Sequence, residues 1–123
     1  MAGQHQSIVV VEDDAAMSKA IERLLRAAGF QPLSFASAEE LLQTEAADSA
    51  ACLVLDIHLP GMSGLQLGQL LVTSGRAKAV IFITGQDEPH LQDEAQRLGC
   101  AYFRKPFEGN AFLESIRQAI KLD

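Results

Sequence analysis

One stretch near the middle of the chain restricts the possible folds more than any other: residues 52–64, with the sequence CLVLDIHLPGMSG. Its first part is apolar and branched, which is typical of a strand buried on both faces of a parallel sheet. The apolar run ends on Asp56, and the residues after it include a proline and two glycines, which a helix interior does not tolerate. Asp56 is therefore predicted to lie where a buried strand runs out into a loop. An aspartate there can serve the turn alone, but in open α/β sheets this edge also carries ligands and chemistry.

The rest of the chain alternates between short apolar runs and amphipathic helices. After an acidic triplet at residues 12–14, apolar residues recur at helical spacing up to Ala28, and Gly29 follows where left-handed caps are common. The predicted strands cover residues 8–11, 31–35, 53–56, 79–84 and 101–104. The predicted helices run over residues 17–28, 38 to about 47, 64–74, 89–98 and 109–122.

Local signals mark where some helices begin and which side they bury. Ser37 followed by Glu40 is a capping-box pattern. Asp87 is expected to cap the helix that has Pro89 in its first turn. In the helix from residue 64, three leucines are expected to face inward: Leu67, Leu70 and Leu71.

The order of the elements predicts the fold class. Because strand and helix alternate five times with short connections, right-handed crossovers and a parallel sheet with helices on both faces are expected. The 123 residues suffice for one compact domain and are too few for two. The predicted class is α/β, a single three-layer sandwich of five parallel strands. Residues 1–6 are expected to be a disordered polar tail and residues 7–123 the domain.

Charge and composition limit the partners. The chain has 16 acidic and 10 basic residues, a net charge of −6, which argues against nucleic-acid binding by this domain itself. Cys52 and Cys100 show no metal-binding or redox spacing and are expected to be buried thiols in a reducing compartment. The sequence shows no signal-peptide pattern and no apolar run of membrane-spanning length. A soluble, cytoplasmic protein without membrane contact is expected.

Polar residues follow four of the predicted strands: Glu12 and Asp13, then Asp56, Thr84 and Lys105. The carboxyl ends of parallel strands share one edge, so three carboxylates, a hydroxyl and an ammonium group should converge there. Crowded carboxylates stay ionised only with a cation among them, and an all-oxygen ligand set favours Mg²⁺. A carboxylate beside Mg²⁺ is a competent nucleophile toward phosphorus and would give an aspartyl phosphate. Lys105 and Thr84 would then contact the oxygens of the transferred group.

Five separated motifs make the chain resemble the receiver domains of bacterial two-component response regulators. In order they are VVEDD at 10–14, VLD at 54–56, LPGMSG at 59–64, ITG at 83–85 and KPF at 105–107. The resemblance covers the chain from Ser7 to Leu122. It implies the flavodoxin-like (βα)5 fold with a strand order of 2-1-3-4-5, and identifies residues 7–123 as a receiver domain.

The resemblance implies a role for each residue of the acidic edge. Asp56 is expected to be the phosphoacceptor and a Mg²⁺ ligand, Asp13 a direct Mg²⁺ ligand, and Glu12 a partner acting through water. The backbone carbonyl of His58 is expected to complete the protein ligands, while its side chain lies at a position that tunes dephosphorylation in this family. Asp14 falls outside the acidic pair and is expected to serve the start of the first helix.

The resemblance also implies a conformational switch formed by Thr84 and an aromatic residue of the last strand. Thr84 is expected to lack an acceptor at rest and to move toward the phosphoryl group. From Gly99 to Lys105 the chain is one residue shorter than is usual in the family. With the missing residue placed in the loop, Tyr102 is the switch aromatic; with a shifted register, Phe103 takes that role. The Lys105–Pro106 bond is expected to be cis.

The implied function is a phosphorylation-controlled switch rather than an enzyme. A histidine kinase or a small phosphodonor would phosphorylate Asp56, and the signal would leave through the fourth helix, fifth strand and fifth helix. Residues 30–42 are similar to receivers of nitrogen-fixation and LuxR-type transcription regulators. That similarity implies a C-terminal helix-turn-helix output domain outside this chain. Homodimer formation on phosphorylation is also expected.

Two alternatives stay open from the sequence. The first is a stand-alone receiver that acts by protein contacts. The second is a Mg²⁺-dependent phosphohydrolase with an aspartate nucleophile, which usually needs another carboxylate soon after the nucleophile and a cap. Here Ile57 and His58 follow Asp56, and the chain leaves no room for a cap. A module that works without phosphorylation is disfavoured by the intact acidic, hydroxyl and lysine set.

Overall fold

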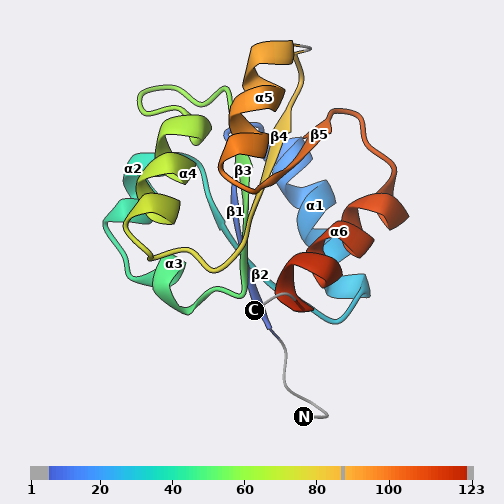
Figure 1. Ribbon diagram of the computed structural model, residues 1–123. Coiled ribbons are helices and arrows are strands. Elements are labelled where there is room, and N and C mark those ends of the chain that lie inside the picture. The colour runs from blue at the N-terminus through green and yellow to red at the C-terminus, as the bar shows by residue number, and fades with distance from the viewer. Residues whose placement is uncertain (1–5, 87, 122–123) are drawn as a thin grey trace.

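The computed structural model describes residues 6–86 and 88–121 of the chain. Strands and helices alternate along it (Figure 1). The strands are β1 (Ser7–Val11), β2 (Gln31–Phe35), β3 (Cys52–Asp56), β4 (Val80–Thr84) and β5 (Ala101–Arg104). The helices are α1 (Ala15–Ala27), α2 (Ala38–Leu42), α3 (Ala46–Ser49), α4 (Gly64–Thr73), α5 (Pro89–Arg97) and α6 (Gly109–Lys121). The predicted tail, apart from Gln6, the predicted cap Asp87 and the predicted helix end Leu122 lie outside the described residues.

The five strands form one parallel sheet in the order β2-β1-β3-β4-β5. Each predicted strand is present within one residue of its predicted bounds. The register pairs Val11 with Leu55, Asp56 with Ile83, and Thr84 with Arg104. The α/β class and the predicted strand order are therefore confirmed, and the carboxyl ends of β1, β3, β4 and β5 lie along one edge.

The sheet separates two buried cores, because successive side chains of a strand point to opposite faces. Val9 of β1 packs on the face covered by α2, α3, α4 and α5, whereas its neighbour Val10 packs on the face covered by α1 and α6. Figure 1 shows these two helical layers on either side of the sheet. We call them the α2–α5 face and the α1/α6 face. β3 is buried along its whole length, as the apolar run predicts.

Two glycines let α4 approach the sheet very closely. A Cβ atom on Gly64 would lie 1.9 Å from the carbonyl oxygen of Asp56, and one on Gly68 would lie 2.4 Å from Cζ of Phe82. The helix therefore turns its glycine side, together with Leu67 and Leu71, toward the sheet. The prediction that Leu70 faces inward is wrong: that side chain is 43% exposed, because the close glycine contacts rotate it off the buried side.

The predicted helix from residue 38 to about 47 is wrong in its length, since the segment forms two short helices, α2 and α3. The hydroxyl of Thr44 lies at the break. It donates to the carbonyl of Leu41 at 2.8 Å and accepts the N–H of Ala46 at 3.2 Å. A threonine that bonds its neighbouring backbone in this way competes with helical hydrogen bonds, which accounts for the interruption.

The signals at the helix starts are partly confirmed. Ser37 Oγ accepts the N–H of Glu40 at 3.1 Å, but the Glu40 carboxylate accepts the N–H of Ala36 instead of that of Ser37. Helix α5 begins with Pro89 and follows Glu88, whose side chain makes no capping hydrogen bond. Half of the predicted capping box is therefore present.

Further sequence predictions concern single residues and the membrane. Gly29 has a φ of +91°, the left-handed conformation predicted after the first helix. Both cysteines are free thiols; Cys52 is buried and Cys100 is half-buried. Within residues 6–86 and 88–121, no helix combines the length and apolar character needed to cross a membrane.

Candidate functional site

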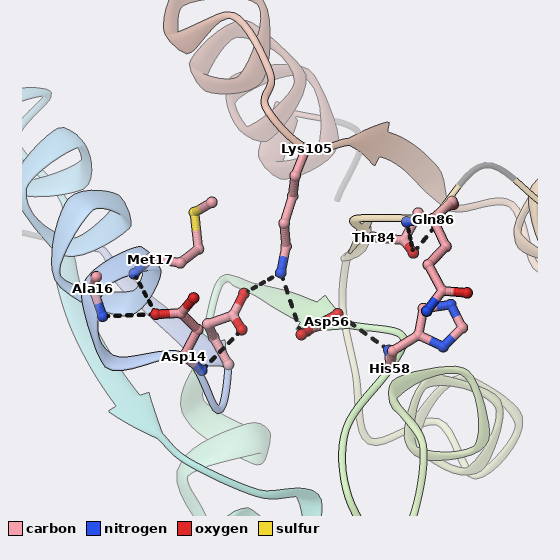
Figure 2. Close-up of polar contacts among 9 residues, drawn as sticks. Asp14, Ala16, Met17, Asp56, His58, Thr84, Gln86 and Lys105 are labelled. Atoms are coloured by element: carbon pink, nitrogen blue, oxygen red, sulfur yellow. Dashed lines mark hydrogen bonds and ion pairs between the residues drawn. The ribbon is translucent and has the colours of Figure 1, made fainter.

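The carboxyl edge of the sheet brings together the polar residues that follow the strands (Figure 2). Glu12 follows β1, Asp56 ends β3, Thr84 ends β4 and Lys105 follows β5. Glu12 and Asp56 are each 3% exposed, and Thr84 is fully buried. Charged groups with so little contact with water need partners within the protein.

Lys105 supplies the positive charge of the site. Its Nζ lies 2.7 Å from Glu12 Oε1 and 3.3 Å from Asp56 Oδ2. Its backbone N–H donates to the carbonyl of Thr84 at 2.7 Å, which fixes the start of the side chain. Burial by itself lowers the pKa of Lys105, but the hydrogen bond with Glu12 and the charge of Asp56 outweigh it and raise the pKa. The ammonium group therefore stays charged. The Lys105–Pro106 bond is cis, as predicted.

Glu12 is a buried carboxyl group of the cluster, and its pKa is raised. Burial raises its pKa to about 7 from 4.5, against the lowering effects of the Lys105 hydrogen bond and the N–H of Asp14. The neighbouring Asp56 raises the pKa further, because it also bears negative charge. One ammonium group thus does not fully offset the carboxylates around it.

Three carboxylates lie close enough to share one cation. Oxygen atoms of Glu12, Asp13 and Asp56 all lie within 4.8 Å of one another, and Asp13 is the exposed member. A set made only of oxygen ligands, with an excess of negative charge and one open side, fits Mg²⁺. These residues therefore suit the predicted ion.

Asp14 takes the separate role predicted for it. Its Oδ1 accepts the N–H of Ala16 at 2.9 Å and that of Met17 at 3.3 Å, so it caps α1 (Figure 2). The N–H of Asp14 donates to Glu12 Oε2 at 3.1 Å. The start of α1 thereby holds Glu12 in place as well.

His58 contacts the site in two ways, one of which sequence reasoning missed. Its backbone N–H donates to Asp56 Oδ1 at 3.1 Å. Its imidazole Nε2 lies 3.0 Å from Oε1 of Glu88, which precedes α5. The loops after β3 and β4 are thereby joined beside Asp56. The two residues are 30 positions apart in the sequence, without any local pattern, so no sequence signal could have paired them.

The hydroxyl of Thr84 is engaged with its own loop. It accepts the N–H of Gln86 at 3.1 Å and lies 3.4 Å from the carbonyl oxygen of Gln86, to which it donates a long hydrogen bond (Figure 2). The expectation that Thr84 lacks an acceptor is therefore wrong. A turn in which a threonine hydroxyl bonds the backbone two residues later is a common local arrangement. Movement toward Asp56 would break these contacts.

Tyr102 and Phe103 lie on opposite faces of the sheet. Tyr102 pairs with Phe82 in register and packs on the α2–α5 face. Phe103 packs on the α1/α6 face, where its ring lies 6.0 Å from that of Phe107 and 5.7 Å from that of Phe112. Phe103 thus belongs to an aromatic cluster, and Tyr102 lies on the same face of β4 and β5 as Phe82.

The strand order and the polar residues at the carboxyl edge place this chain in a class of α/β proteins. In these proteins the functional site lies on the loops that follow the parallel strands. A family model described as the response regulator receiver domain matches residues 8–117. The chain belongs to this family, whose members are in general signalling domains.

Relatives with known names agree with this assignment. Nodulation protein W of Bradyrhizobium diazoefficiens is 36% identical over 117 residues, which are 94% of this chain and 52% of that protein. Response regulator protein TmoT of Ectopseudomonas mendocina is 34% identical over 99% of this chain and 56% of that protein. The chain spans about half the length of these relatives. Transcriptional regulatory protein FixJ of Azorhizobium caulinodans is 34% identical over 90% of this chain and 53% of that protein. The C4-dicarboxylate transport transcriptional regulatory protein DctD of Rhizobium meliloti is 34% identical over 92% of this chain and 25% of that protein.

Solved structures show the same fold. The response regulator StyR has a TM-score of 0.86 at 33% identity, covering 97% of this chain and 61% of that chain. The structure titled FixJ-N has a TM-score of 0.84 at 28% identity, covering 96% of this chain and 95% of that one. A CheY-like receiver from Methanospirillum hungatei, with a TM-score of 0.87 at 24% identity, agrees in fold.

Proposed function

We propose that Asp56 is the phosphoacceptor of this receiver domain and takes a phosphoryl group from a histidine kinase or a small phosphodonor. The observation that supports this most directly is the position of Asp56, buried at the end of β3, with one oxygen near Lys105 and the other bonded to the His58 backbone. An Asp held by donors on two sides presents its carboxylate in a defined direction.

The other residues of the edge would divide the remaining work. Glu12, Asp13, Asp56 and the backbone carbonyl of His58 would hold Mg²⁺, which neutralises negative charge as the phosphoryl group approaches. In the transfer, an Asp56 oxygen forms the new bond to phosphorus while the bond to the donor's leaving group breaks. Lys105, which already contacts Asp56, would then neutralise a phosphoryl oxygen.

Thr84 and Tyr102 would transmit the change. Thr84 would leave its contacts with Gln86 and donate its hydroxyl to the phosphoryl group. That movement frees space on the α2–α5 face beside Phe82, into which Tyr102 would turn. Phe103 is the weaker candidate because it packs in the aromatic cluster on the other face. The output surface would consist of α5, β5 and α6.

The similarity to longer transcription regulators supports an output domain attached to this receiver in the whole protein. Because the chain spans 53% of FixJ and 25% of DctD, DNA binding would belong to the part of the whole protein outside this receiver. Formation of a receiver homodimer on phosphorylation and a cytoplasmic location are part of the same proposal. The receiver would comprise residues 7–123.

Incubation with acetyl phosphate and Mg²⁺, followed by intact mass measurement, tests the proposal. We expect the wild type to gain the mass of one phosphoryl group and Asp56→Asn to gain none, while its circular dichroism spectrum stays unchanged. An equal adduct on both proteins would mean that a residue other than Asp56 accepts the phosphoryl group. Continuous release of phosphate by the wild type, without a measurable adduct, would indicate a hydrolase instead.

A further inference from the structure

The loop between β3 and α4, residues 57–63, is fastened to helix α2 by the carboxylate of Glu39. Oε2 of Glu39 accepts the N–H of Met62 at 2.8 Å, although the two residues are 23 positions apart. Glu39 lies in the first turn of α2, where the helix dipole favours negative charge. Hydrogen bonds to an ionised acceptor are stronger than those between neutral groups. The contact therefore joins α2 to the segment that leaves Asp56.

Gly61 makes this contact geometrically specific. Its φ is +72°, and a Cβ atom there would lie 2.6 Å from Glu39 Oε2. The carboxylate thus occupies the space that a side chain at this position would take. The N–H of Met62, followed by the backbone N–H of Glu39 itself, lowers the pKa of the Glu39 carboxyl. The acceptor is consequently ionised at neutral pH.

The loop is restrained at both ends, which are also joined to each other, since the N–H of Gly64 donates to the carbonyl of Ile57 at 2.9 Å. At the start, the N–H of Ile57 donates to a β4 carbonyl at 2.9 Å, and the N–H of His58 donates to Asp56 Oδ1 at 3.1 Å. Toward the end, Glu39 holds Met62. The His58 N–H is thus one of the starting attachments, and Glu39 restrains the same short segment four residues later, at Met62.

We propose that Glu39 is a positioning residue of the phosphoacceptor site, holding the 57–63 loop so that the His58 backbone stays beside Asp56 and the cation. This inference rests on the proposed function of that site. Glu39 touches none of the reacting atoms; its effect passes through Met62 and the loop. Because its side chain is exposed, water competes for the carboxylate and for the N–H. Loss of the contact should loosen the loop without unfolding the domain.

Three variants separate positioning from charge. Glu39→Ala removes the acceptor, and Glu39→Gln keeps an oxygen acceptor without the charge. Glu45→Ala removes an exposed charge six residues later in the sequence, whose side chain makes no capping hydrogen bond. Mg²⁺ binding is followed by amide chemical shifts, and Asp56 phosphorylation by intact mass across a Mg²⁺ titration. We expect Glu39→Ala to raise the Mg²⁺ midpoint about three- to tenfold, in keeping with the loss of one hydrogen bond. The rate at saturating Mg²⁺ should stay close to that of the wild type.

Glu39→Gln should restore most of the Mg²⁺ affinity, and Glu45→Ala should leave it unchanged. Amide hydrogen exchange adds a readout that needs neither metal nor phosphodonor: Met62 should exchange faster in Glu39→Ala than in Glu39→Gln. An unchanged Mg²⁺ midpoint in Glu39→Ala, or equal changes in Glu39→Ala and Glu45→Ala, would overturn the inference. A wild type that binds Mg²⁺ but accepts no phosphoryl group would instead overturn the proposed function, while the Mg²⁺ midpoints still decide the role of Glu39.

Discussion

Lys105 supplies positive charge to the acidic edge in the part of the chain that the structure describes. Its ammonium group contacts Glu12 and Asp56 at the same time, and only 17% of its side chain is exposed. Asp13 adds a third carboxylate within reach of the other two. One positive charge against three negative charges leaves an excess that a divalent cation matches. In the metal-free protein, burial raises the pKa of Glu12 to about 7, and the neighbouring Asp56 adds to that rise.

The raised pKa of Glu12 predicts how the stability of the metal-free protein changes with pH. The folded protein holds the Glu12 proton up to about pH 7, whereas the unfolded chain releases it near 4.5. Between these values the folded state binds more protons, so its stability should fall as pH rises. With about 1.4 kcal/mol for each unit of pKa shift, the loss attributable to Glu12 should be at most about 3 kcal/mol across that window. Urea unfolding in the presence of a chelator, at both ends of the window, measures it.

The matched control for this titration is Glu12→Gln, which cannot lose a proton. Other carboxylates also titrate in this range, so the informative quantity is the difference between the pH slopes of the two proteins. The wild type should lose more stability with rising pH than Glu12→Gln does. If the unfolding free energies of the two proteins changed equally with pH, the pKa of Glu12 would not be raised in the folded state.

At the scale of elements, two loops hold the resting arrangement of the site. The loop after β4 bonds the hydroxyl of Thr84 through Gln86, and Glu88 of the same loop pairs with His58 from the loop after β3. The His58–Glu88 pair is partly exposed on both sides, so its stabilising effect is small. A weakly held loop suits a switch, because the two states of a switch differ by only a few kcal/mol.

Coupling between Thr84 and Tyr102 is expected to appear in the response to beryllofluoride, which mimics a phosphoryl group. In the wild type, amide resonances of α5 and of Tyr102 should shift along with those near Asp56. In Thr84→Ala the shifts near Asp56 should remain while those of α5 and Tyr102 shrink, because the hydroxyl that follows the phosphoryl group is missing. Equal distant shifts in both proteins would exclude this route.

The elements differ in how far they could be predicted from sequence. Strands and their polar ends could be predicted, because burial on both faces and the residue that ends the run are local features, as at Asp56 and Thr84. The rotation of α4 about its axis could not be predicted, because it depends on how closely Gly68 approaches Phe82 between the helix and the sheet. The pairs Glu39–Met62 and His58–Glu88 could not be predicted for a related reason. Each joins a side chain to a group in a separate segment, a backbone N–H in the first pair and a side chain in the second, and neither leaves a periodic pattern.

At the scale of the whole molecule, Mg²⁺ should stabilise the fold, because the acidic cluster exists only when β1 and β3 are paired. At about ten times its dissociation constant, the ion should add about 1.4 kcal/mol and raise the melting temperature by several degrees. Asp56→Asn should melt higher than the wild type without metal, because one repelling charge is gone, and should respond less to Mg²⁺. Differential scanning calorimetry with and without Mg²⁺ makes both comparisons. A wild-type melting temperature unaffected by millimolar Mg²⁺ would argue against the assembled site.

The sheet alternation that sends Tyr102 and Phe103 to opposite faces has an evolutionary consequence. Under the proposed role of Tyr102, variation there alters signalling as well as packing on the α2–α5 face, whereas variation at Phe103 disturbs an aromatic cluster on the α1/α6 face. A lineage would then adjust its response to a stimulus mainly through the Tyr102 codon. A saturation library over these two positions should return two different fitness profiles, with Phe103 variants losing folded protein first and Tyr102 variants losing response first.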